Sequence, residues 1–164
     1  MPKRLYTLQV SIIEGPVTED FAKRNPTISR TIEIRGDQTL ERLHYAIFEA
    51  FDRWEQHMYE FQFGTGPHDL DGDRYGIQLP FEMPPDPSDT RRPAGDAAKT
   101  TIDSLGLELN RAFGYWFDFG DDWYHQIDVV AIGEAVPRRR YPKVIAGVGE
   151  SPPQYADFDD EDEE

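Results

Sequence analysis

Hydrophobic residues recur along this chain with two spacings, every second residue in several segments and every third or fourth in one. Alternation predicts strands over residues 5–13 and 28–34, each with one face buried. Between them, residues 14–25 contain Gly15 and Pro16 and are typical of a connection. The two strands are therefore expected to form a hairpin with a long tip.

The helical spacing is found once and predicts a helix over residues 38–53. Asp37 or Thr39 is placed to cap its start. Its apolar face would be formed by residues that recur every three or four positions, namely Leu40, Leu43, Ile47, Phe51 and Trp54.

In later segments of the chain, aromatic residues occupy every second position. They predict a strand over residues 57–63 and a hairpin of residues 113–119 and 123–132, which turns at Gly120-Asp121-Asp122. Residues 101–107 suggest a short helical turn, and the closing segment 141–153 is Pro/Gly-rich and extended.

Residues 64–100 form a Pro/Gly-rich excursion in which only residues 75–81 suggest a short strand. We interpret residues 1–153 as a single domain and residues 154–164 as a disordered acidic tail. The order of elements predicts an α+β fold: a hairpin, a helix, a strand, the excursion and a second hairpin. One amphipathic helix would pack across a mixed, β-grasp-like sheet.

The charge of the chain limits its partners. Thirty-two acidic residues against 17 basic ones give a net charge of −15, and the last ten residues carry seven acids and no base. Because no domain-wide basic face is available, direct nucleic-acid binding is disfavoured. The tail is expected either to be a solubilising segment or to dock a basic partner.

The absence of cysteine excludes disulfides, thiolate zinc sites and a cysteine nucleophile. No apolar run is long enough to span a membrane, and no signal-peptide core follows the basic N-terminus. These features predict a cytoplasmic protein.

Three histidines are predicted to point inward: His44 on the helix, His57 beside the third strand and His125 in the second hairpin. A three-histidine site for zinc or another divalent transition metal, with Asp118 or Asp121 as base or orienting group, is one hypothesis. The other is that each histidine is separately satisfied by hydrogen bonds at the edge of the core. Trp116 and Tyr124 alternate with the buried residues of the second hairpin and would point to its other face, where they form a candidate interaction patch.

Several segments resemble the plasmid Ri ORF-3-like family over nearly the whole chain up to Pro153. They are the run Thr39 to His44, the run His57 to Phe61, and the motif Asp118-Phe119-Gly120-Asp121-Asp122-Trp123-Tyr124-His125. Some members of this family are carried as passenger genes on insertion sequences. The resemblance implies a compact α+β fold with a β-grasp-like core, and it draws attention to His44, His57, Asp118, Gly120, Asp121, Trp123 and His125.

The chain departs from the family after its Pro-Pro pair. Members typically continue with an acid, a cysteine and two glycines, whereas here Gln154 and Tyr155 lead into the acidic tail. Since no coherent nucleophile or acid/base pair is present, the leading hypothesis is a non-catalytic binding or adaptor module for a protein partner, associated with mobile genetic elements. The alternative is a metal-dependent hydrolytic enzyme that uses the three histidines.

Overall fold

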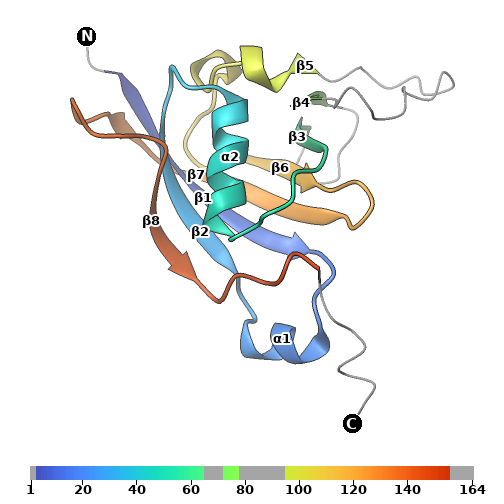
Figure 1. The fold of residues 1–164 in the computed structure, drawn as a ribbon. Coiled ribbons are helices and arrows are strands. Elements are labelled where there is room, and N and C mark those ends of the chain that lie inside the picture. The colour runs from blue at the N-terminus through green and yellow to red at the C-terminus, as the bar shows by residue number, and fades with distance from the viewer. Residues whose placement is uncertain (1–2, 65–71, 78–94, 156–164) are drawn as a thin grey trace, which may run out of the picture.

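A computed structural model describes residues 3–64, 72–77 and 95–155. They form one eight-stranded sheet with one main helix across it, which confirms the α+β prediction (Figure 1). The elements in chain order are β1 (Arg4–Glu14), α1 (Glu19–Arg24), β2 (Ser29–Arg35), α2 (Leu40–Ala50), β3 (Tyr59–Phe63), β4 (Asp73–Ile77), β5 (Gly95–Asp96), the 3₁₀ turns Ala97–Lys99 and Asp103–Leu105, β6 (Ala112–Phe117), β7 (Trp123–Glu134) and β8 (Lys143–Val148).

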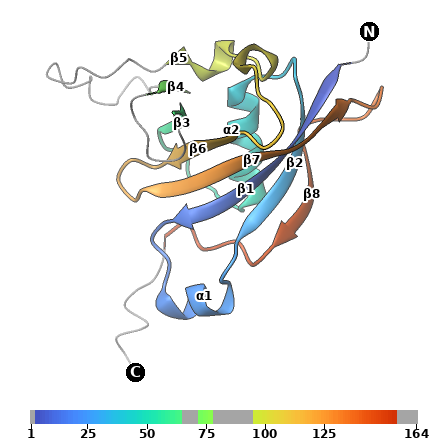
Figure 2. The same cartoon turned by 180° about the vertical axis from the view of Figure 1, so that it is seen from behind.

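The strand order is β5-β4-β3-β6-β7-β1-β2-β8. All neighbours are antiparallel except β4 and β5, so the sheet is mixed as expected. Both predicted hairpins are confirmed, β1 with β2 and β6 with β7. From behind, β7, β1 and β2 lie in front of α2, and no helix of the described residues covers this second face (Figure 2).

The core lies between α2 and the sheet. The inward residues of β1 and β2 meet the helix residues Leu40, Leu43 and Ile47, all fully buried. Thr39 begins the helix as predicted, because its hydroxyl accepts a hydrogen bond from the backbone N–H of Arg42. A large aromatic set completes the core, including Phe51, Phe61, Phe113, Phe117 and Trp123.

Several predicted boundaries are corrected. The helix ends at Ala50 rather than residue 53, because Asp52 adopts a left-handed conformation with φ of 56°. Trp54 therefore leaves the apolar face and is 68% exposed. The connection 14–25 contains a short helix, α1, capped by Thr18. The short strand expected over residues 75–81 is found at Asp73–Ile77, and its predicted end lies outside the described residues.

The closing segment also differs from expectation. Residues 143–148 form strand β8, which pairs with β2. Gln154 and Tyr155, assigned to the tail by sequence, lie against the domain, and Gln154 is buried. Residues 156–164 lie outside the described residues, as does most of the excursion 64–100. Within the described part of the chain, no helix has the length and apolar character to cross a membrane.

Candidate functional site

The three histidines are not brought together as a ligand set. His44 lies on α2, His57 precedes β3 and His125 lies on β7, and their ring nitrogens are engaged by different partners. In the described part of the chain, no group of three or more His, Asp or Glu side chains has the arrangement of a metal site. His44 and His125 lie in the interior, whereas His57 is half-buried at the surface, and the periodicity of the sequence carries no information about which rings meet.

His44 is a buried, neutral member of the core. Its Nδ1 lies 2.6 Å from the hydroxyl of Tyr115 and its Nε2 lies 3.1 Å from Oε1 of Gln56. These partners assign the ring hydrogen to Nε2, so that Tyr115 donates to Nδ1. The ring also stacks on Tyr59 at 3.7 Å. Burial lowers the pKa of His44 to about 4, so the imidazole is neutral at physiological pH.

His125 is fully buried and joins β6 to Arg53. Its Nδ1 donates to the carbonyl oxygen of Tyr115 at 3.1 Å, and its Nε2 accepts from Nη2 of Arg53 at 2.8 Å. Burial, together with the nearby Arg53 charge, lowers the pKa of His125 well below its ordinary value. Each of these two histidines thus has both ring nitrogens satisfied by hydrogen bonds.

Arg53 is a buried cation that sequence analysis did not single out. Its guanidinium lies 4.8 Å from the ring centre of Phe117 and 5.2 Å from that of Trp123. Among the described residues it forms no ion pair, and its Nη1 has no hydrogen-bond partner. Burial lowers the pKa of Arg53 to about 10, which leaves it charged at physiological pH.

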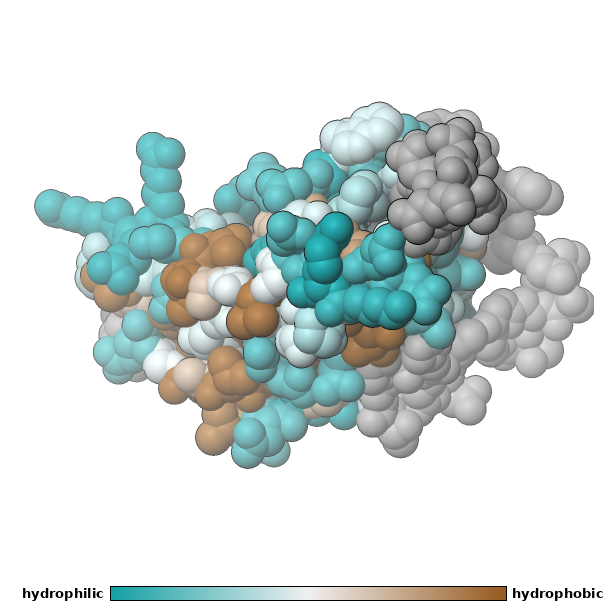
Figure 3. Space-filling model, turned by 90° about the horizontal axis from the view of Figure 1, so that it is seen from below, coloured by the Kyte–Doolittle hydropathy of each residue, from teal (hydrophilic) through white to brown (hydrophobic). Residues whose placement is uncertain are grey.

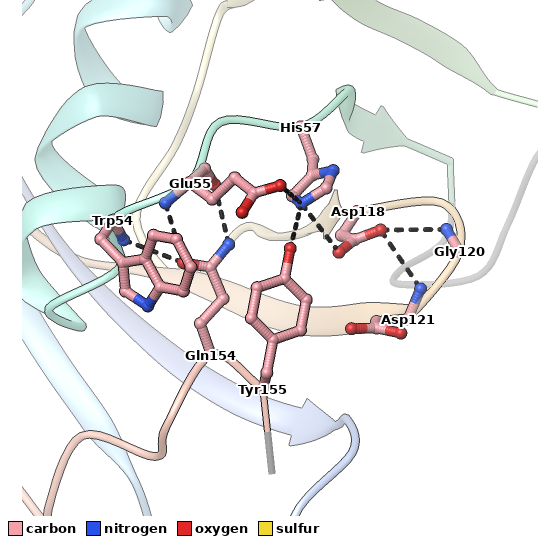
Figure 4. A network of polar contacts seen from close by, with 8 residues as sticks. All are labelled: Trp54, Glu55, His57, Asp118, Gly120, Asp121, Gln154 and Tyr155. Carbon is pink, nitrogen blue, oxygen red and sulfur yellow. Dashed lines mark hydrogen bonds and ion pairs between the residues drawn. The ribbon is translucent and has the colours of Figure 1, made fainter.

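His57 and Asp118, two of the predicted site residues, do meet. Oδ2 of Asp118 lies 3.4 Å from Nε2 of His57. Oδ1 of Asp118 accepts hydrogen bonds from the backbone N–H groups of Gly120 and Asp121, which fixes the carboxylate in the β6–β7 turn (Figure 4). Asp118 itself has a positive φ of 61°, a conformation that aspartate tolerates better than most residues. The family-like motif therefore begins with a turn-forming carboxylate aimed at His57.

Tyr155 completes this arrangement from the C-terminal segment. Its hydroxyl lies 2.7 Å from Nε2 of His57, and its ring meets that of Trp54 edge to face at 5.5 Å. Glu55 adds a second carboxylate, 3.6 Å from the same His57 nitrogen. We call this surface the aromatic–acidic patch, defined by Trp54, Glu55, His57, Asp118, Asp121 and Tyr155 (Figure 4).

Gln154 holds the patch together. Its Oε1 accepts hydrogen bonds from the backbone N–H groups of Trp54 and Glu55, and its Nε2 donates to the carbonyl oxygen of Glu55. A single side chain thereby ties the C-terminal segment to the loop that carries Trp54, about a hundred residues earlier in the chain. The backbone that carries both exposed aromatic residues is therefore tied together by hydrogen bonds.

Replacing Gln154 with alanine is expected to destabilise the fold by about 1–3 kcal/mol, because two backbone donors and one acceptor lose their partner. Urea unfolding measures this loss, and limited proteolysis should show earlier cleavage near Tyr155. The exposed neighbour Pro153, changed to alanine, is the matched control. Equal stability of the two variants would contradict the bracing role of Gln154.

The patch has a negative electrostatic character. Burial and the neighbouring Asp118 carboxylate raise the pKa of Asp121. Partial burial, followed by the charges of Glu55 and Asp118, raises the pKa of Tyr155. Burial is the larger cause of both shifts, and the neighbouring carboxylates add a smaller contribution that disfavours further negative charge here.

The other predicted residues lie elsewhere. Trp116 and Tyr124 are half-buried on the face of the sheet opposite α2, where their rings stack on each other at 5.4 Å. Nε1 of Trp116 donates to Asp122 at 2.9 Å. Trp123 is fully buried in the core, and its Nε1 has no hydrogen-bond partner among the described residues.

Sequence comparison relates this chain to known proteins. The profile of the plasmid pRiA4b ORF-3-like protein family matches residues 19–158. The chain belongs to this family. It is 28% identical over 145 residues to the uncharacterized protein y4hQ of Sinorhizobium fredii (strain NBRC 101917 / NGR234), a match that covers 88% of this chain and 66% of y4hQ. The chain therefore spans a little under two thirds of that relative.

A solved structure shares the fold of this plasmid pRiA4b ORF-3-like protein. It is the crystal structure of a protein of unknown function, MM3350, from Methanosarcina mazei Go1, with a TM-score of 0.66 and 24% sequence identity. The similarity covers 90% of this chain and 71% of MM3350. At this level of identity the likeness concerns the fold alone.

Proposed function

We propose that this protein is a non-catalytic binding module that captures a basic segment of a partner protein at the aromatic–acidic patch. The observation that carries this proposal is Trp54, the most exposed of the large hydrophobic side chains among the described residues, which meets the ring of Tyr155 edge to face. Exposed tryptophan and tyrosine are the residue types most often found at the energetic centre of protein interfaces.

The chemistry around the two rings supports a positively charged partner segment. Glu55 and Asp121 are exposed carboxylates, and Asp118 lies just beneath them. Aromatic faces and carboxylates both attract Lys ammonium and Arg guanidinium groups. The net charge of −15 further draws basic partners toward the protein.

The positions of the described side chains support binding rather than catalysis. The hydroxyl in contact with the His57–Asp118 pair belongs to Tyr155, and the described contacts of the patch include no serine, threonine or cysteine side chain. A cytoplasmic role as an adaptor associated with mobile genetic elements belongs to the same proposal. Its support is the lack of cysteine and the plasmid reading frame after which the family is named.

Replacing Trp54 with alanine is expected to weaken binding of a fluorescent hexa-arginine peptide about 3- to 30-fold, the range that corresponds to loss of one cation–π partner. Anisotropy titrations at physiological ionic strength measure the affinity, with hexa-glutamate as the negative probe.

The matched control is Tyr45→Ala. Tyr45 is an exposed aromatic residue on α2 and its replacement leaves the net charge unchanged. We expect the Tyr45→Ala protein to bind hexa-arginine like the wild type. If both variants bind equally well, attraction by the overall charge explains the affinity and the patch has no special role.

A further inference from the structure

Strand β8 presents an open edge of the sheet. It pairs with β2 on one side, and its other side has no strand partner among the described residues. All six residues of β8 are exposed, and its aliphatic side chains Val144, Ile145 and Val148 are 42%, 47% and 55% exposed. Seen from below, hydrophobic side chains gather in the left half of the molecule, the side on which β8 lies (Figure 3).

Natural proteins usually protect such an edge, because its unpaired N–H and C=O groups accept another strand. Here β8 contains no proline, and its only charged residue is Lys143 at one end. The opposite edge of the sheet is the two-residue strand β5, which offers little to pair with. The β8 edge is therefore the one suited to strand addition.

The segments that flank β8 carry opposite charge, with Glu33 of β2 opposite Lys143 at the first end and Arg30 of β2 hydrogen-bonded to the Val148 carbonyl and Ser151 at the second. At the beginning lie Lys143 and the exposed run Arg138-Arg139-Arg140, none of which forms an ion pair with a described residue. Beyond the other end lie Glu150, held by Asn25, and Asp52, whose carboxylate accepts a hydrogen bond from Ser151. Gly149, with a φ of 78°, ends the strand between Val148 and these acids.

We propose that two copies of this chain associate through β8, antiparallel about a two-fold axis, to form one continuous sheet. This arrangement brings the basic end of each strand to the acidic end of the other and covers the aliphatic side chains of both. A parallel arrangement would place like charges together at each end. The charge order along β8 thus selects an antiparallel second copy as the occupant.

The first test is sedimentation velocity over a hundredfold range of protein concentration. The wild type is expected to form a dimer, and Ile145→Lys is expected to be monomeric. Val136→Lys is the matched control, since Val136 is similarly exposed but lies outside the strand, and this variant is expected to remain dimeric. A wild type that is monomeric at every concentration overturns the proposal, as does equal dissociation of both lysine variants.

Exchanging the charges at the two ends of β8 tests whether the two strands run antiparallel. Lys143→Glu and Glu150→Lys are each expected to shift the equilibrium toward monomer. The variant that carries both changes restores opposite charges across the two-fold axis and is expected to dimerise again. Circular dichroism verifies that each variant is folded. Failure of the double variant to recover relative to the single ones would exclude antiparallel pairing.

Discussion

Lowering the pH from neutral to about 4 is expected to destabilise the folded protein by about 3 kcal/mol through His44 alone. Burial lowers the pKa of His44 from 6.5 to about 4. Between these two values the unfolded chain binds a proton that the folded chain does not, so each decrease in pH favours unfolding. Below about 4 both states are protonated and the loss levels off. Above 6.5 the stability is fully present.

His125 adds to the same loss, because burial and the Arg53 charge keep its pKa well below the ordinary value. Urea unfolding at a series of pH values measures the combined effect. His44→Gln is the reference, since glutamine cannot gain a proton but can still accept from Tyr115. Carboxylates that titrate in the same pH range are present in both proteins, so their contribution cancels in the comparison. The two pH profiles should therefore diverge below 6.5, and parallel profiles would show that His44 does not titrate on unfolding.

Replacing Arg53 with alanine is expected to cost about 3–5 kcal/mol of folding free energy. The change removes a long side chain packed on Phe117 and Trp123, and it leaves Nε2 of buried His125 without a donor. Burying the Arg53 charge, whose Nη1 has no hydrogen-bond partner among the described residues, itself costs free energy. Removing this charge therefore offsets part of the destabilisation.

Arg53→Met separates the two contributions. Methionine keeps most of the apolar contact with the aromatic rings but carries no charge and no donor. We expect its destabilisation, measured by urea unfolding, to be less than half that of the alanine variant. Equal losses would instead assign the effect to the hydrogen bond with His125.

The sequence was informative wherever an element buries one face. Alternation located β1, β2 and the β6–β7 hairpin, and the helical spacing located α2, because the helix and these strands each have one side in the core. The same reasoning could not find β8, all of whose side chains are exposed. Nor could it find α1, a helix of six residues that buries only Phe21.

The candidate site was less accessible to sequence reasoning. Trp54 continues the helical spacing of Leu40 to Phe51, and only the left-handed turn at Asp52 takes it to the surface. Gln154 and Tyr155 gave no signal at all, because their contacts join positions about a hundred residues apart. His57 and Asp118 were both chosen from the sequence, but their meeting depends on the β6–β7 turn lying against the loop before β3.

The central place of β1 in the sheet determines how quickly the protein folds. On one side β1 pairs with β2, its neighbour in sequence, and on the other with β7, where Leu8 faces Val129. The β1–β2 ladder closes a short loop, whereas the β1–β7 ladder requires a loop of more than a hundred residues, whose closure entropy opposes early pairing. Folding is therefore expected to be slow for the size of the chain, with its rate limited by the arrival of β7 at the open side of β1.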